Sequence, residues 1–351
     1  MNSVYEKLAD ALNTLPNGFP RTDTGSDIRL LQYMYSEKEA ELACCLTKDA
    51  ESVKDIAERL NKLPKEVQAG LLHMTKEGKV WMDMSDGRPK FRLAPFIVGS
   101  YEAHIEHMNE EMSLLFEDYL KDGGVKGIMT YQPSVHRAVP TIEHAELEWI
   151  LPYDNVLKII DDAETFHVQD CICRIQQDSI GKGCDAPKHN CLSFSKGTRK
   201  PKEGDISKEE AIKIIKEAED AGLVHSVSNV VDGLHYICNC CGCCCGVLRG
   251  ITEWGIENSM ARANYEAIVD EDGCIGCEVC IERCQVNAIE IEDGKAKINR
   301  DKCLGCGLCI STCPTEAIEL KARPKEEQVE PPKDFGEWEQ KRLEDRASRK
   351  I

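Results

Sequence analysis

Two cysteine runs with the same spacing lie near the C-terminal end of the sequence and limit what this part of the chain can fold around. Both runs read C-x2-C-x2-C-x3-C, and the second follows the first at an offset of 29 residues, the separation of Cys274 from Cys303. The eight thiols are those of Cys274, Cys277, Cys280, Cys284, Cys303, Cys306, Cys309 and Cys313. The repeat extends beyond the thiols, because Ala288 corresponds to Ala317 at the same offset. Two equivalent halves are therefore expected.

The runs resemble those of bacterial-type ferredoxins with two [4Fe–4S] clusters, over residues 269–320. In such ferredoxins the last cysteine of each run ligates the other cluster. The resemblance implies one cluster on Cys274, Cys277, Cys280 and Cys313, and a second on Cys303, Cys306, Cys309 and Cys284. Gly276, Gly305 and Gly307 suit a close approach of backbone to a cluster. Pro314 follows the second run as the pattern requires, whereas Gln285 takes this place after the first.

Zinc is the alternative for these eight thiols, since C-x2-C pairs also bind zinc. Zinc sites usually pair two such units across a longer gap, so the complete run occurring twice favours iron–sulfur clusters. Disulfide bonds are less favoured still. The sequence shows no apolar signal segment and no twin-arginine leader at its start, so its 20 cysteines indicate metal-ligating thiols in the cytoplasm.

Length and charge set further limits. A chain of 351 residues has room for about two or three domains, of which the repeat uses a small part. No apolar run reaches the roughly 18 residues of a membrane-spanning helix. The formal net charge of −18 disfavours general nucleic-acid binding and favours contact with basic surfaces of redox partner proteins.

A second concentration of thiols lies in the middle of the sequence. Its ten cysteines are Cys171, Cys173, Cys184, Cys191, Cys238, Cys240, Cys241, Cys243, Cys244 and Cys245. Packing explains such a density poorly in a reducing compartment, so we expect ligation of a soft metal. A further iron–sulfur centre is the first interpretation. A zinc site and thiol chemistry remain alternatives, because the spacing matches no simple template.

Residues 37–98 have a pattern of three helices and a hairpin. The expected elements are helices over Glu37–Leu46, Val53–Leu60 and Pro64–Glu77, and strands over Val80–Met84 and Lys90–Leu93 around a turn at Ser85-Asp86-Gly87. This order resembles a winged-helix domain, whose third helix enters a DNA major groove. DNA binding is not favoured, because glutamates offset the lysines of that helix. Cys44 and Cys45 are expected to be small core residues.

The fold expected for the whole chain is α+β and multidomain, with a mixed α/β cysteine-rich middle region and a duplicated βαβ domain at the C-terminus. Its expected parts are N-terminal helices at 1–36, a winged-helix-like domain at 37–98, a cysteine-rich domain at 99–262, a two-cluster ferredoxin domain at 263–322 and a charged tail at 323–351. Other expected elements are a helix over Ile97–Leu120, a loop over Asp122–Pro140, and a helix over Lys208–Ala221 with a capping box of Ser207 and Glu210.

Nearly the whole chain also resembles a family of 4Fe–4S-binding proteins from anaerobic bacteria and archaea. The segments that carry this resemblance are Leu15–Pro20, Cys171–Arg174, Cys184 with Pro187 and Cys191, Gly222–Asn229 and Ile237–Gly246. The resemblance implies a shared architecture and supplies no substrate or reaction.

Two functions follow as hypotheses. The first is an iron–sulfur electron carrier or redox subunit, and any enzyme built this way would be an oxidoreductase. The second is a redox or iron sensor whose cluster state controls DNA binding by the winged helix. A structural metal protein is a weaker third option. No glycine fingerprint for nucleotides follows an expected strand, so flavin and nicotinamide binding are not supported.

Overall fold

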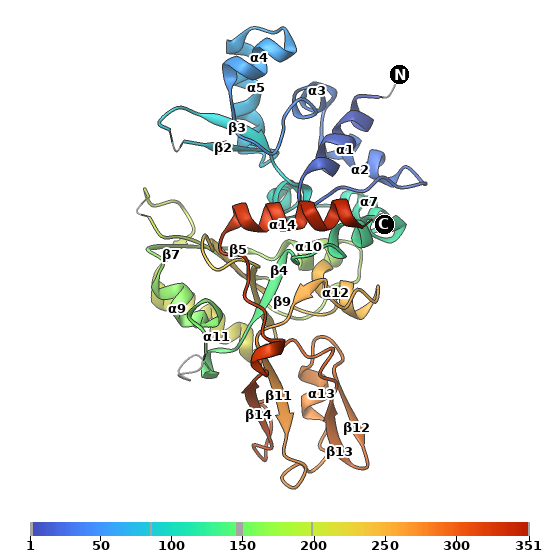
Figure 1. Cartoon of the computed structure of the whole chain (residues 1–351), viewed down its shortest axis with the longest axis vertical. Helices are drawn as coiled ribbons and strands as arrows, with labels where there is room; N and C mark the ends of the chain where they lie inside the picture. Colours follow the sequence, from blue (N-terminus) through green and yellow to red (C-terminus); the bar gives the residue numbers. More distant parts are fainter. Residues whose placement is uncertain (1–2, 85, 145–149, 198, 350–351) are drawn as a thin grey trace. The chain divides into compact units, whose positions relative to one another are not determined.

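The computed structural model describes residues 3–84, 86–144, 150–197 and 199–349 (Figure 1). The chain forms two compact units. The first comprises Met1–Tyr131 together with Glu339–Ile351, and the second comprises Gln132–Trp338. Within the described residues, no helix combines the length and apolar character needed to cross a bilayer.

The first unit is mainly helical. Its principal elements are α1 (Val4–Thr14), α2 (Ser26–Met34), α3 (Glu37–Ala43), β1 (Glu51–Ser52), α4 (Val53–Leu60), α5 (Pro64–Lys76), β2 (Val80–Asp83), β3 (Lys90–Leu93), α7 (Glu110–Tyr119) and α8 (Val125–Met129). Local sequence explains where two of these helices begin. Ser36 caps α3 in a capping box with Glu39, and Pro64 occupies the first turn of α5. The three short strands pair antiparallel in the order β1-β3-β2.

The helices and strands expected over residues 37–93 are present, and β1 is an addition that the sequence did not suggest. The turn residue Ser85 lies outside the described residues. Assignment of this segment to the winged-helix class stays a prediction. The expectation for the two vicinal cysteines was wrong. Cys44 caps the C-terminus of α3, Cys45 follows the helix, and both thiols are only half-buried, each 3.4 Å from the carbonyl oxygen of Glu41.

The prediction of a single helix over Ile97–Leu120 was also wrong. The backbone of Ile97 and Val98 is extended, short one-turn helices follow, and α7 starts afresh where the Asn109 side chain accepts a hydrogen bond from the amide of Met112. The apolar periodicity reflects instead an aromatic cluster within this unit. Its rings are those of Phe19, Phe96, Tyr101, Phe116 and Tyr119.

The prediction of one loop over Asp122–Pro140 was wrong as well. Gly123 adopts a left-handed conformation with φ of 118°, which turns the chain and lets α8 resume. After α8 the strand β4 (His136–Val139) is buried along its whole length, because it lies between two other strands of a sheet. Glycine, proline and serine therefore mark the turns around these elements and not one continuous loop.

The charged tail contains the helix α14 (Phe335–Ser348). Arg342 on this helix is completely buried, and its guanidinium donates to the backbone carbonyls of Pro16 and Tyr131 at 2.9 and 2.5 Å. A buried cation with carbonyl acceptors fixes the helix in place. The indole nitrogen of Trp338 donates to the carbonyl of Ser134 at 3.0 Å.

The second unit is built on a seven-stranded sheet in the order β10-β4-β8-β9-β6-β5-β7. The added strands are β5 (Thr165–Asp170), β6 (His189–Ser195), β7 (Asp205–Ile206), β8 (Val224–Ser228), β9 (Tyr236–Cys240) and β10 (Met260–Ala261). The connecting helices are α9 (Val156–Asp161), α10 (Ile172–Ser179), α11 (Lys208–Asp220) and α12 (Gly246–Thr252). The predicted capping box of Ser207 and Glu210 starts α11, which packs on β5, β6 and β8.

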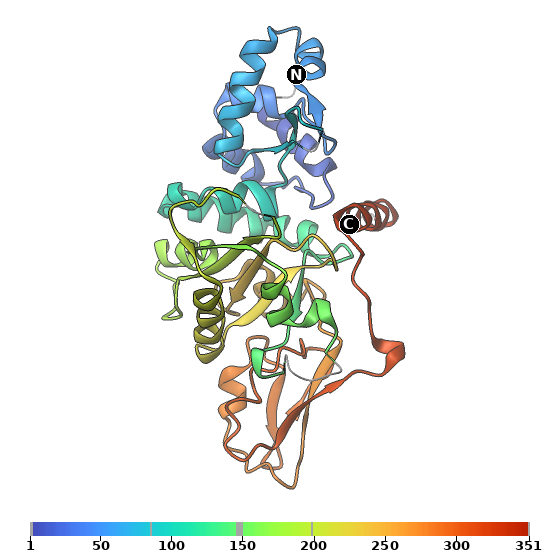
Figure 2. The same ribbon diagram turned by 90° about the vertical axis from the view of Figure 1, so that its left-hand side faces the viewer.

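The repeat lies at one end of the second unit, beyond the seven-stranded sheet (Figures 1 and 2). Its elements are β11 (Tyr265–Val269), α13 (Val279–Arg283), β12 (Ile289–Glu292), β13 (Lys295–Ile298) and β14 (Ile318–Ala322). Strand β11 pairs with β14 and β12 pairs with β13. The two pairings are equivalent, since Val269 lies opposite Ile318 in one and Ile298 lies opposite Ile289 in the other. Turns over 308–312 replace the helix in the second half.

Candidate metal centres

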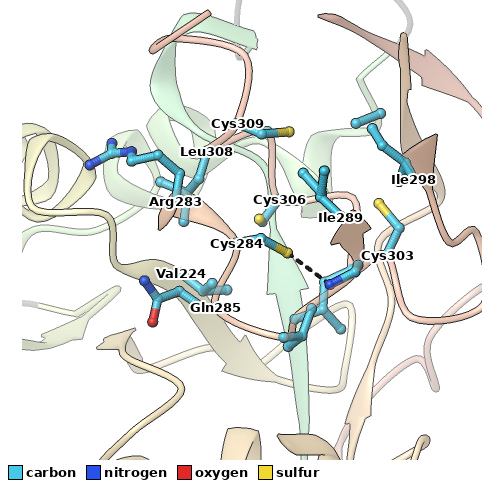
Figure 3. Close-up of a pocket in the computed structure, with 15 residues that line it drawn as sticks. Val224, Arg283, Cys284, Gln285, Ile289, Ile298, Cys303, Cys306, Leu308 and Cys309 are labelled. Atoms are coloured by element: carbon cyan, nitrogen blue, oxygen red, sulfur yellow. Dashed lines mark hydrogen bonds between the residues drawn. The ribbon is translucent and has the colours of Figure 1, made fainter. Parts of the chain in front are cut away.

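One cavity in the repeat is lined by four cysteines (Figure 3). They are Cys284, Cys303, Cys306 and Cys309. Three come from the second run and one from the end of the first, which is the grouping that the sequence suggested for the second cluster. The remaining wall is largely apolar, with Ile289, Ile298 and Leu308 among its residues.

Burial shapes the acidity of these thiols. It raises the pKa of Cys306 to about 12, and it raises the pKa of Cys309 well above the usual range and that of Cys284 in the same direction. Because iron binds the thiolate, an inorganic core must displace these protons when it binds.

The other four cysteines of the repeat include Cys280, and the remaining three lie near it. Burial raises the pKa of the Cys280 thiol, and the nearby charges of Cys277, Cys274 and Cys313 raise it further. The structure thus brings together the set suggested for the first cluster. Cys277 is exposed, whereas Cys274 and Cys280 are buried.

Backbone amides point at sulfur in both halves of the repeat. The amide of Ala288 donates to the sulfur of Cys284 at 3.2 Å, and the amide of Ala317 donates to the sulfur of Cys313 at 3.3 Å. These two bonds occupy equivalent positions. Amide donors stabilise negative charge on a cysteine sulfur and tune the potential of a cluster bound to it.

Two of the glycines in the runs are required by their neighbours. Gly276 and Gly305 have φ of 66° and 70°, and a Cβ atom would lie 2.3 Å from the carbonyl oxygen of Gly294 in the first case and 2.2 Å from that of Tyr265 in the second. Only glycine fits both the left-handed backbone and the close approach. The approach is to the turn between β12 and β13 in the first case and to strand β11 in the second, which holds each cysteine loop against its strand pair.

Gln285, which replaces the expected proline, joins the repeat to the cysteine-rich region. Its side-chain oxygen accepts a hydrogen bond from the amide of Gly242 at 2.8 Å. Arg283 donates to the carbonyls of Glu219 and Asp220, at 2.6 and 2.9 Å, at the C-terminus of α11, where a cation is favoured by the helix dipole. The cavity of Figure 3 accordingly has Val224 of β8 in its wall.

The ten middle cysteines fall into two groups. In the larger group each of six thiols interacts with two others, which closes a ring. The order around the ring is Cys171, Cys173, Cys245, Cys240, Cys238 and Cys191. We call this group the six-thiol ring. Hydrogen bonds from Cys173 and Cys191 hold the pKa of Cys171 well below its usual range, and those from Cys238 and Cys245 lower the pKa of Cys240 to about 6.

Neighbouring strand ends assemble the six-thiol ring. Cys238 and Cys240 lie two residues apart on β9 and so face the same side of the sheet. Leu192 of β6 pairs with Ile237, so the same register places Cys191 beside Cys238. Cys171 follows β5 directly and caps α10.

The smaller group consists of Cys184, Cys241, Cys243 and Cys244, which we call the four-thiol group. Their sulfur atoms all lie within 4.8 Å of one another. The sulfur of Cys184 is 3.8 Å from that of Cys241 and 3.7 Å from that of Cys244, and the sulfurs of Cys243 and Cys244 are 3.7 Å apart.

Arg174 lies between the two groups and was missed by sequence reasoning as a functional residue. It is buried, and its Nη1 donates to the carbonyl of Asn239 at 3.0 Å and to the sulfur of Cys241 at 3.7 Å. Burial alone lowers the pKa of this arginine, but the charges of Cys171 and Cys241 raise it overall. Its position directly after the C-x-C pair was the available signal.

A polar chain that the sequence did not suggest leads away from the six-thiol ring. The sulfur of Cys240 is 3.4 Å from Oγ of Ser226, which is 3.5 Å from Nδ1 of His136. Nε2 of His136 is 2.8 Å from the hydroxyl of Tyr236, and burial lowers the pKa of this histidine to about 4. Its residues are dispersed over β4, β8 and β9, so only the sheet brings them together.

Comparisons with known proteins bear on the repeat alone. Residues 267–320 match the family model of the 4Fe-4S dicluster domain, so the chain carries a ferredoxin-type domain that binds iron–sulfur clusters. Ferredoxin-2 of Desulfomicrobium norvegicum (strain DSM 1741 / NCIMB 8310) is 50% identical over 32 residues, which are 9% of this chain and 54% of the ferredoxin. The chain thus spans about half the length of that relative. No solved structure matches the chain.

Proposed function

We propose that this chain is an iron–sulfur electron-transfer protein or redox subunit. It holds one [4Fe–4S] cluster on Cys274, Cys277, Cys280 and Cys313, and a second on Cys303, Cys306, Cys309 and Cys284. The observation that carries the proposal is the cavity of Figure 3, in which cysteines from both runs meet inside an apolar wall. Apolar surroundings exclude water from a cluster and help to set its potential.

The two proposed clusters have different surroundings, which suggests separate roles. Cys277 of the first set is exposed, so a redox partner could reach this cluster from solvent. The second set lies against Val224 of β8 and against Arg283 and Gln285, two residues of the repeat that hydrogen-bond to the cysteine-rich region. Electrons would pass between a partner protein and the middle of the chain by way of both clusters.

We assign a further iron–sulfur centre to the six-thiol ring. Six thiols exceed the four that one cubane needs, and hydrogen bonds from neighbouring thiols lower the pKa of Cys171 and of Cys240. This centre would either extend the electron relay or reduce a substrate, which would make the chain an oxidoreductase. Membership of the wider family of anaerobe 4Fe–4S proteins is part of the same proposal.

Metal and sulfide analysis of the anaerobically purified full chain tests the proposal. Two cubanes require about eight iron and about eight sulfide per chain, with the EPR signals of interacting reduced cubanes. Zinc with little iron would overturn the assignment to electron transfer.

The DNA-binding sensor remains a second candidate because of the element order in the first unit. Helices α3, α4 and α5 are followed by the hairpin β2-β3, and β1 pairs with β3. Leu72 of α5 and Trp81 and Met82 of β2 are exposed, and such apolar side chains suit a protein partner better than phosphates. Absence of DNA retention at low salt, with the clusters oxidised and reduced, would eliminate this candidate.

A further inference from the structure

We infer that the four-thiol group binds one divalent metal ion, Zn²⁺ or Fe²⁺, as a closed tetrahedral site separate from the iron–sulfur clusters. Its ligands are Cys184, Cys241, Cys243 and Cys244. The inference does not depend on the proposed electron transfer, since it concerns thiols outside the repeat and outside the six-thiol ring.

The separation of the sulfur atoms carries the inference. At a tetrahedral ion with metal–sulfur bonds of about 2.3 Å, the sulfurs lie roughly 3.8 Å apart. The three close pairs of the four-thiol group measure 3.7 to 3.8 Å. Each thiolate of a cubane binds a different iron, so its four sulfurs must stand further apart. The four-thiol group therefore fits a single ion.

Ordinary packing of small apolar residues is the competing explanation. Cys241 and Cys244 do pack with Ala218 and Leu223 in a buried cluster. Packing does not account for Cys243, which is exposed and still within 4.8 Å of the other three sulfurs. It also does not account for Arg174, a buried cation with a nitrogen 3.7 Å from the sulfur of Cys241.

Charge supports the metal site. Four thiolates around a divalent ion leave a net charge of about −2, which a buried site tolerates only with a compensating partner. The Arg174 guanidinium supplies positive charge on the buried side at Cys241. On the opposite side Cys243 is exposed, which gives the ion a route of entry and lets the displaced thiol protons leave.

The turn that carries most of these ligands also contacts the repeat. Three of them flank or occupy the turn 242–244 after β9, and Cys184 comes from the loop between α10 and β6. Gly242 in this turn contacts the residue after Cys284, because a Cβ at Gly242 would lie 2.1 Å from the carbonyl oxygen of Gln285. An ion at this turn would therefore fix the surface on which the repeat is seated.

Serine replacement tests the site in the full chain. Cys184→Ser combined with Cys243→Ser should remove one equivalent of metal and leave the acid-labile sulfide and the EPR signals of the clusters unchanged. Loss of zinc identifies Zn²⁺, and loss of one iron without sulfide identifies Fe²⁺. The matched control is Cys44→Ser combined with Cys45→Ser, two half-buried thiols of the first unit, which should change no metal content.

Two outcomes overturn the inference. One is loss of about four iron together with sulfide, which would make the site a cubane. The other is no loss of any metal. Should the double variant fail to fold, spectroscopy of the wild-type chain tests the site instead. X-ray absorption at the zinc edge should show four sulfur neighbours at about 2.3 Å, or Mössbauer spectra should contain a mononuclear tetrathiolate iron component. A wild-type chain with neither feature also refutes the site.

Discussion

The eight cysteines of the repeat and the four-thiol group of the middle region use the same side chain in different ways. In the repeat, Cys284, Cys303, Cys306 and Cys309 line one cavity. In the four-thiol group all four sulfur atoms lie within 4.8 Å of one another. The distance between sulfurs thus distinguishes a site with room for bridging sulfide from one that closes on a single ion.

The two regions also differ in how their thiols are brought together. In each proposed set of the repeat, a local loop holds three thiols and the fourth thiol comes from the other run. In the middle region the thiols come from strand ends and loops that meet only when the sheet forms. Metal binding by the middle region should therefore depend more on formation of the sheet than metal binding by the repeat does.

The largest expected effect is on the clusters of the repeat. Cys303→Ser with Cys309→Ser should remove one cubane, about four iron with their sulfide, because two of its four ligands are lost. Cys277→Ser with Cys280→Ser should remove the other. Iron and sulfide analysis with EPR measures both, and the magnetic interaction between reduced clusters should vanish in each variant. Unchanged iron in either variant would contradict the proposed ligand sets.

A smaller loss of iron and sulfide is expected when cysteines of the six-thiol ring are replaced. Cys173→Ser with Cys245→Ser interrupts two adjacent positions of the ring and should lower iron and sulfide by no more than one centre. The two-cluster EPR signal of the repeat should persist. A variant that keeps its full iron content would show that the ring is not an iron–sulfur site.

Backbone strain in the repeat gives the next effect. Gly305→Ala should reduce stability by more than about 1–3 kcal/mol, because it adds a clash with the Tyr265 carbonyl to the strain of a left-handed residue. Gly294→Ala is the matched control, with φ of 75° and open space around its Cβ, and should cost only about 1–2 kcal/mol. The temperature at which cluster absorbance is lost measures both. Equal shifts would contradict the close approach.

The smallest effect is expected at α11, away from the metal ligands. Ser207→Ala removes the side chain that accepts from the amide of Glu210 at 3.2 Å, at a cost of about 1 kcal/mol. Thermal unfolding followed by circular dichroism should shift down by about 2–4 °C. Iron content should not change, and a loss of iron would show that this helix supports a cluster.

Sequence periodicity predicted much of the local structure. Helices α4, α5 and α11 and the hairpin β2-β3 appear within a residue or two of the expected bounds, because caps, a proline in the first turn and alternating residues are local signals. The grouping of the eight repeat thiols came from the resemblance of the runs to those of ferredoxins, and four of the thiols, Cys284, Cys303, Cys306 and Cys309, line one cavity. Their role as ligands stays a prediction.

What the sequence could not supply depends on distant contacts. The division of ten thiols into a ring and a four-thiol group follows from the register of β6 and β9 and from the loop that carries Cys184. Arg342 illustrates the same limit. A charged helix near the C-terminus reads as a surface tail, and only backbone carbonyls more than 200 residues away make its arginine a buried residue.

The substitution at Gln285 has a consequence for the direction of electron flow. In a duplicated domain with matching halves, the two clusters would have equal reduction potentials, and an incoming electron would favour neither. Within the described residues, the hydrogen bonds of Arg283 and Gln285 join the first half of the repeat to α11 and to the turn at Gly242. In the proposed relay, unequal hydrogen bonding and solvent exposure would give two otherwise identical clusters unequal reduction potentials. The electron would then favour one of the two cluster sites.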